Sequence, residues 1–114
     1  MRIIFKAKIH CDYSNLKRYL PAQYISLIPK CYYGEVVNLV IFPVDKFAIN
    51  SREVIKAHQK IVDTEIKTFY FAQCFTTEAI KFITENNGAA FELDDFVWSD
   101  EDCNRIRNNI YSIL

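Results

Sequence analysis

The chain has 114 residues, of which 51% are hydrophobic and 25% are charged, a balance that excludes intrinsic disorder and fits one folded domain over residues 1–114. Two glycines and three prolines exclude a collagen-like or linker-rich organisation. Basic and acidic residues number 14 each, so the formal net charge is zero.

The N-terminal segment alternates apolar and basic side chains over residues 3–9, where Lys6 and Lys8 separate the apolar positions. Alternation with a period of two is typical of a strand that is buried on one side, so we expect an edge strand here. Residues 14–20 predict a short helix that ends before Pro21, because proline interrupts a helix.

Residues 36–42 form a nearly unbroken apolar segment. Six of the seven residues are apolar, and Gly34 and Pro43 flank the segment. This pattern predicts a central strand that is covered on both faces. Residues 22–28 fit neither a helix nor a strand uniquely, and residues 29–34 are typical of a turn.

Two helix starts follow the central strand. Asn50 with Glu53 three residues later resembles a helix N-terminus, and Thr76 can begin a second helix in the same way. Asn87 and Gly88 end the second helix, with Gly88 expected in the left-handed conformation. The first helix would carry Val54, His58, Ile61 and Val62 on one apolar face.

Strands are expected over residues 64–72 and 89–93, and a closing helix after residue 99. Strands that alternate with helices at this spacing favour parallel crossover connections. The sequence therefore predicts a single small α/β domain, with a mostly parallel or mixed sheet of four to five strands and flanking helices.

Residues 70–96 resemble the final strand, helix and strand of the Mrr-type branch of the restriction-endonuclease-like fold. In that family an apolar strand leads into a helix that starts with F-T-x-E-A, and the next strand ends in acidic residues. Because these positions are structural in the family, the resemblance implies a restriction-endonuclease-like topology rather than an activity. The matching residues here are Phe75, Thr76, Glu78, Ala79, Phe82, Leu93, Asp94 and Asp95.

Nucleases of this family use an Asp together with an E-x-K or Q-x-K pair to hold a divalent metal. The strand expected to carry the pair, residues 36–42, contains no Gln, Glu or Lys. We therefore expect no catalytic site, no bound metal and no cofactor. The alternative is a metal-dependent endonuclease that uses Asp45, Glu65 and Lys67, which match the D…E-x-K pattern elsewhere in the chain.

Charge is distributed unevenly along the chain. The first 30 residues hold six basic residues and one acidic residue, whereas residues 82–114 hold two basic and seven acidic residues. Residues 92–102 mix acidic and aromatic side chains, which suits a protein interface because rings supply binding energy and charge speeds association. The predicted partner-binding residues are Glu92, Asp94, Asp95, Trp98, Asp100, Glu101 and Asp102.

A second interpretation of this acidic segment stays open. Phe96 and Trp98 can pack beneath the closing helix while Asp100, Glu101 and Asp102 occupy its first turn, where the helix dipole favours acidic residues.

In its general character the chain is similar to bacterial immunity proteins, which are small cytosolic partners that block a toxin nuclease. The similarity implies a cytoplasmic protein whose acidic surface covers the cationic cleft of a basic toxin nuclease domain. The first ten residues carry no signal-peptide pattern, and no apolar run is long enough to span a membrane. A nucleic-acid-binding module built from the basic, tyrosine-rich N-terminal third is a further alternative, although we do not expect direct nucleic-acid binding.

The remaining reactive side chains are expected to be structural. His10, Cys11 and Asp12 are neighbours in sequence, so their side chains diverge and suit a turn better than a catalytic site. His58 falls on an apolar helix face, as a core histidine would. The four cysteines form no closely spaced pair of zinc ligands, and Cys74 is expected to be a buried thiol.

Overall fold

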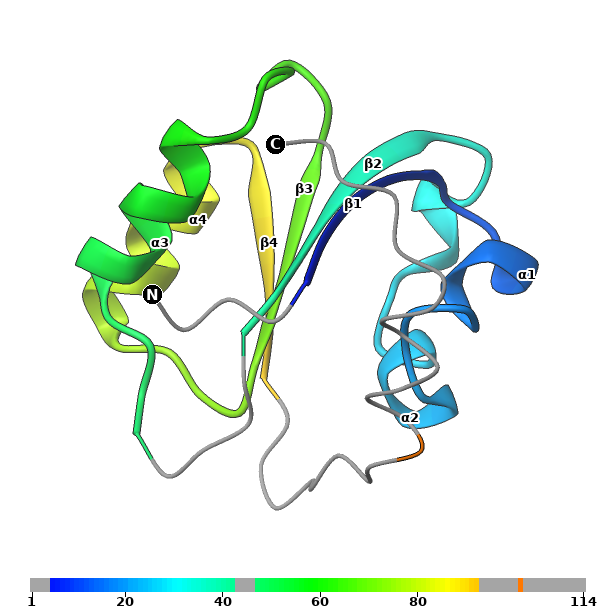
Figure 1. The fold of residues 1–114 in the computed structure, drawn as a ribbon, viewed down its shortest axis with the longest axis horizontal. Coiled ribbons are helices and arrows are strands. Elements are labelled where there is room, and N and C mark those ends of the chain that lie inside the picture. Colours follow the sequence, from blue (N-terminus) through cyan, green and yellow to red (C-terminus); the bar gives the residue numbers. More distant parts are fainter. Residues whose placement is uncertain (1–4, 43–46, 93–100, 102–114) are drawn as a thin grey trace.

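The computed structural model describes residues 5–42, 47–92 and 101, and these form a three-layer α/β domain (Figure 1). The middle layer is a sheet of four strands, which are adjacent in chain order. The first pair is antiparallel and the other two pairs are parallel, so the expected mixed sheet with an N-terminal edge strand is confirmed. The strands are β1 (Phe5–His10), β2 (Val36–Ile41), β3 (Thr68–Ala72) and β4 (Gly88–Glu92).

One face of the sheet is covered by two helices, α3 (Ser51–Gln59) and α4 (Thr77–Glu85) (Figure 1). Asn50 Oδ1 accepts a hydrogen bond of 3.0 Å from the Glu53 backbone N–H, and Thr76 Oγ1 accepts one of 3.2 Å from Ala79. Both predicted helix starts are therefore confirmed, because these side chains satisfy amides that a helix start leaves without an internal partner.

The opposite face is covered by short segments: α1 (Tyr13–Leu16), α2 (Ala22–Ile25) and the 3₁₀ turn η1 (Lys30–Tyr32). The helix expected over residues 14–20 is therefore only one turn long. The buried side chains after that turn reach the core from non-helical backbone or from the single turn of α2, so packing rather than helix propensity determines this segment. Tyr19, Leu20 and Ile28 are non-helical, and Tyr24 and Ile25 belong to α2.

The expected central strand is confirmed as β2, which lies between β1 and β3 and is buried from Val37 to Ile41. Asn38 is the polar residue in this run and is only 1% exposed. Its Nδ2 atom donates to the Asp63 carbonyl oxygen (3.0 Å) and to Thr68 Oγ1 (3.4 Å). This buried amide ties the connection after α3 to the start of β3.

The third strand begins at Thr68, so the prediction that it starts at residue 64 is wrong. Asp63 Oδ1 accepts a hydrogen bond from the Glu65 backbone N–H (3.3 Å), and such local side-chain bonds compete with strand pairing. Val62, expected on the apolar face of the helix, is 85% exposed, because α3 ends at Gln59.

The turn after α4 also differs from expectation. Asn87 takes the left-handed conformation, with φ at 57°, and Gly88 begins β4 instead. A Cβ atom at position 88 would lie 2.7 Å from Ile83 Cγ2 and 2.8 Å from the Ile83 carbonyl oxygen. Glycine is therefore required at position 88 by close packing, not by a positive φ.

Candidate functional site

The predicted acidic segment begins at the carboxyl edge of the sheet. Glu92 is the last residue of β4, pairs with Ala72 of β3 and is exposed. Its Oε2 atom accepts a hydrogen bond of 3.0 Å from the backbone N–H of Phe75, which lies just before α4. The Glu92 carboxylate is therefore held at the edge where open α/β sheets commonly bind their ligands.

Glu101 is the second predicted partner-binding residue that the structure describes, and it is exposed. The other predicted partner-binding residues, Asp94, Asp95, Trp98, Asp100 and Asp102, lie outside the described residues. The closing helix expected after residue 99 lies outside them too, apart from Glu101.

A cavity of about 540 Å³ opens at the opposite, amino edge of the parallel strands, and we refer to it as the amino-edge cavity. It lies where β2 starts and where the chain enters β3 and β4, because Val36, Lys67 and Asn87 all line it. The remaining lining residues are Tyr32, Glu35, Glu65 and Ile66.

Charged and aromatic groups meet in the amino-edge cavity. The Lys67 Nζ atom lies 5.6 Å from the centre of the Tyr32 ring, which is the geometry of a cation–π contact. The Tyr32 ring in turn packs edge-on against Phe69 of the core, with 5.1 Å between ring centres. Glu35 and Glu65 are exposed at the same cavity.

Two members of the alternative nuclease trio, Glu65 and Lys67, are therefore brought together, but in the loop before β3. Asp45 lies outside the described residues. The described residues on either side of this gap are Phe42 and Phe47, so the complete trio stays a prediction.

The His10–Cys11–Asp12 cluster forms the turn that was expected. Asp12 Oδ1 accepts a hydrogen bond of 2.7 Å from the Asn15 backbone N–H and begins α1. The Cys11 side chain is buried, and this burial, with the charges of Asp12 and Glu35, raises the pKa of its thiol to about 11. A thiol with such a pKa stays protonated at neutral pH and is a poor nucleophile.

His58 packs edge-on against Phe82, with 5.3 Å between ring centres, but it is half-buried, and its Nδ1 atom has no hydrogen-bond partner among the described residues, so it is not the fully satisfied core histidine that was expected. Cys74 is half-buried rather than buried, because it lies in the loop after β3. Among the residues that the structure describes, no three His, Cys, Asp or Glu side chains form a group that could hold a metal ion.

Five basic side chains from two elements gather on the α3 side of the sheet. Lys6 and Lys8 alternate along β1 with Ala7 and Ile9, which face the α1 side, and three more basic residues lie on α3 and at its C-cap. Burial lowers the pKa of Lys6, and the charge of Lys60 lowers it further, so the two elements contribute to one surface. We refer to this surface as the basic ridge: Lys6, Lys8, Arg52, Lys56 and Lys60.

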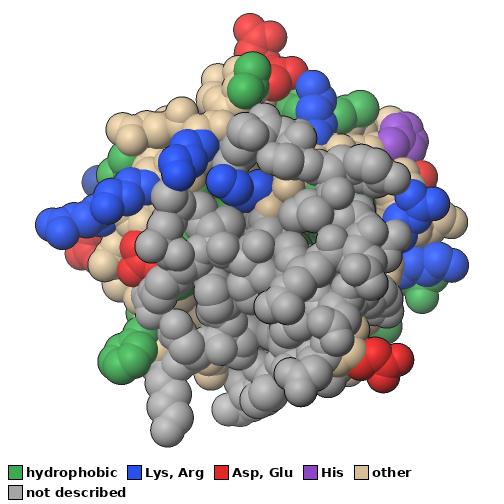
Figure 2. Space-filling model, in the orientation of Figure 1, with side chains coloured by type: hydrophobic (Ala, Val, Ile, Leu, Met, Phe, Trp, Pro, Cys, Tyr) green, Lys and Arg blue, Asp and Glu red, His purple; other side chains and the backbone are tan. Residues whose placement is uncertain are grey.

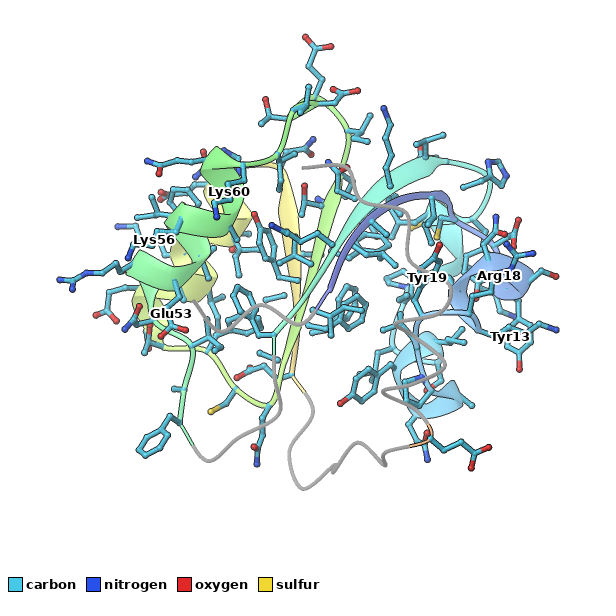
Figure 3. All side chains as sticks on the ribbon, in the orientation of Figure 1. Tyr13, Arg18, Tyr19, Glu53, Lys56 and Lys60 are labelled. Atoms are coloured by element: carbon cyan, nitrogen blue, oxygen red, sulfur yellow. The ribbon has the colours of Figure 1, made fainter. Side chains whose placement is uncertain are left out.

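The space-filling view shows Lys and Arg side chains gathered over α3 and toward the sheet (Figure 2). Lys56 of α3 and Lys60, which caps the end of this helix, project on this side of the molecule (Figure 3). The ridge cannot be recognised in the sequence, because β1 and α3 are far apart in the chain and only the fold brings them together.

The tyrosines proposed for base stacking are divided between core and surface. Tyr19 and Tyr24 are buried, whereas Tyr13 is 55% exposed. Tyr13 and Arg18 project outward from the α1 region while Tyr19 turns toward the sheet (Figure 3). The N-terminal third therefore contains no continuous row of exposed tyrosines within the described residues.

No family model matches the sequence, and the comparisons with curated proteins and with solved structures give no match either. None of the helices within the described ranges has both the length and the apolar character of a membrane span.

Proposed function

We propose that this protein is a non-catalytic, protein-binding immunity protein, which neutralises a bacterial toxin nuclease by covering its active-site cleft. The acidic segment 92–102 is the proposed contact surface, with Trp98 as its aromatic anchor. The proposal includes a cytoplasmic location, where such a partner would be met.

The position of Glu92 carries this proposal. It is the first of six acidic residues in the segment, it is exposed, and its backbone is fixed by pairing with β3. The bond from the Phe75 N–H fixes the carboxylate as well. A segment that starts from a fixed point loses less conformational freedom on binding than a free tail would, which favours affinity.

Charge explains how such a surface would inhibit a nuclease. A nuclease cleft is lined with basic side chains that bind phosphates, so a surface of carboxylates competes for the same groups. Complementary charge also speeds the encounter of the two proteins, and this electrostatic attraction weakens as salt is added. The inhibition is expected to need no chemistry on the part of this protein.

We further propose that the scaffold has a restriction-endonuclease-like topology. The described residues that carry this resemblance lie at and within α4: Phe75 precedes the helix, Thr76 caps it, and Ala79 is buried beneath it, whereas Leu93, Asp94 and Asp95 lie outside the described residues. Their roles are structural, which is what the resemblance implies. They support a shared scaffold rather than a shared activity.

The test is binding and inhibition of the nuclease domain of a toxin encoded beside the gene. The variant D94K/D95K reverses two charges of the acidic segment and should abolish inhibition, and E101K should weaken it in the same direction. Glu92 is changed only to Gln, because glutamine keeps an oxygen that can accept the bond from Phe75.

The control is E85K, which makes the same charge change as E101K at an exposed position in the last turn of α4. It should bind as the wild type does. Equal inhibition by D94K/D95K, E85K and the wild type would remove the acidic segment from the proposal, and failure of the wild type to bind would remove the function.

A second candidate function is nucleic-acid binding by the basic ridge, which the convergence of β1 and α3 favours. Arg52, Lys56 and Lys60 repeat every four residues, so their charges recur every ~6 Å along the helix. The Lys8 Nζ atom lies 3.5 Å from Asp63 Oδ2, and such an exposed pair is weak enough to be exchanged for a phosphate contact.

Salt dependence tests this second candidate. Binding of a fluorescent 20-base-pair DNA duplex should weaken with salt, and K56Q/K60Q should reduce the slope of log K against log salt by about two. The control K17Q/R18Q removes two exposed charges next to α1, on the other side of the sheet, and should leave the slope unchanged. Absence of any retardation at low salt would remove this function.

A further inference from the structure

We propose that the amino-edge cavity receives the charged end of an arginine or lysine side chain from a protein partner. This inference rests on the proposed function, since it assumes a partner that is rich in basic residues. It adds a binding site at the end of the sheet opposite Glu92.

The charges that the cavity leaves unmatched are negative. Among the described residues, neither the Glu35 nor the Glu65 carboxylate takes part in a hydrogen bond or an ion pair. The basic group among the described lining residues, the Lys67 ammonium, already lies over the Tyr32 ring. A ligand that enters the cavity therefore meets two available carboxylates and a cation that is already engaged.

The cavity also offers apolar surface beside these carboxylates. Val36 is 43% exposed and Ile66 is half-buried, and both line the cavity. Arginine and lysine carry an apolar stem below the charged group, and they commonly lay that stem on apolar surface. A small inorganic cation gains no binding energy from apolar surface. In addition, two carboxylates supply fewer oxygens than a calcium ion requires.

The cavity walls are fixed by hydrogen bonds of the backbone. The Glu35 carbonyl oxygen accepts from the Cys11 N–H (2.7 Å), and the Lys67 carbonyl oxygen accepts from the Asn38 N–H (2.9 Å). The Glu65 carbonyl oxygen accepts from Asn87 Nδ2 (3.0 Å). The two carboxylates are therefore attached to backbone that is already fixed, so only their side chains lose conformational freedom when a cation binds.

An arginine head group fits this arrangement best. The planar guanidinium can donate paired hydrogen bonds to a carboxylate, which an ammonium cannot do with the same geometry. The cavity volume of about 540 Å³ has room for such a side chain. We therefore expect a preference for arginine over lysine.

The experiment uses Nα-acetyl-L-arginine amide as the probe and the whole protein in solution. Titration followed by ¹H–¹⁵N NMR should shift the amide signals of Tyr32, Glu35, Glu65 and Lys67. Nα-acetyl-L-citrulline amide, which has nearly the same shape without the charge, should cause no comparable shift. Equal shifts from both probes would overturn the proposal, because they would indicate apolar binding alone.

Two variants locate the site. E35Q/E65Q should weaken binding of the arginine probe by about fivefold or more, because it removes both carboxylate charges while keeping their shape. E85Q removes one exposed charge outside the cavity and should bind as the wild type does. Unchanged binding by E35Q/E65Q, or an absence of shifts in the wild type, would overturn the assignment.

The outcome of the titration with the arginine probe can be read separately from the test of the proposed function. The arginine probe reports on the cavity in the absence of any partner, whereas D94K/D95K reports on the acidic segment with the toxin domain present. If the partner binds and the probe does not, the cavity assignment fails alone. If the probe binds and no nuclease is inhibited, the immunity function fails alone.

Discussion

The two faces of the sheet are covered in different ways. On one face, α3 and α4 are regular helices of nine residues, and each begins with a side-chain cap. On the other face, α1, α2 and η1 are three or four residues long. There the cover depends on large aromatic side chains that pack directly on the sheet.

This difference separates two sources of stability. Caps and helical periodicity are local properties, so the α3–α4 face can form part of its structure before it packs. Helices of one turn are unstable alone, so the other face exists only through burial. On that face the Phe71 ring stacks on Phe91 and on Tyr24, with 5.0 and 6.0 Å between ring centres.

The largest effect should come from the aromatic face. Phe71→Ala removes a fully buried ring from the centre of this stack and should lower the free energy of unfolding by about 3–5 kcal/mol. Urea denaturation followed by circular dichroism measures this loss. Val62→Ala, at a side chain that is 85% exposed, is the control and should change stability by less than about 0.5 kcal/mol. Similar losses of unfolding free energy in the two variants would show that the aromatic stack does not contribute the expected stability.

The contact between α4 and β4 should give the next largest effect. Gly88→Ala places a Cβ atom against both the side chain and the carbonyl oxygen of Ile83 and should cost about 1–3 kcal/mol. Ile83→Ala in the same protein should recover part of this added cost, because it removes the Cγ2 contact and leaves the carbonyl contact. A double-mutant cycle by denaturation measures the coupling, and a coupling of zero would show that crowding by this side chain is not the cause.

The helix caps should give a smaller effect. Thr76→Ala leaves the Ala79 N–H without its hydrogen bond and should cost about 1 kcal/mol. Thr76→Ser keeps the hydroxyl and should retain most of that stability. Thr77→Ala, at the exposed first residue of α4, is the control and should have little effect. Equal losses at positions 76 and 77 would argue against the cap.

Cys11, in the core beneath α1, should have an effect only at high pH. Burial raises its pKa from 9.0 to about 11, so the unfolded chain releases this proton at a lower pH than the folded protein does. The contribution of the protonated Cys11 thiol to the free energy of unfolding is therefore complete below pH 9 and is lost as the pH rises toward 11. Cys11→Ala should reduce the fall in unfolding free energy over that interval. An unchanged pH dependence would show that the thiol does not cause it, and Tyr70, whose buried hydroxyl also has a raised pKa, would be the next group to test.

The candidate sites were only partly predictable. Glu65 and Lys67 were identified as a pair from their spacing, but they were assigned to a strand, whereas they line a cavity in a loop. Tyr32 and Glu35, which complete that cavity, cannot be connected with them from the sequence, because they reach the cavity from the segment before β2, which is distant in the chain. The basic ridge was missed for the same reason, since its members come from β1 and α3.

The sequence by itself determined the α/β class, the buried central strand and the starts of α3 and α4. These features depend on side-chain periodicity and on caps that act over three or four residues, so they can be recognised locally. Only the tertiary structure decided that β3 begins at Thr68, that Asn87 rather than Gly88 turns left-handed, and which charged groups share a surface. Those outcomes depend on contacts between segments that are distant in the chain, such as the bond from Asn38 to Asp63 and the close approach of Gly88 to Ile83.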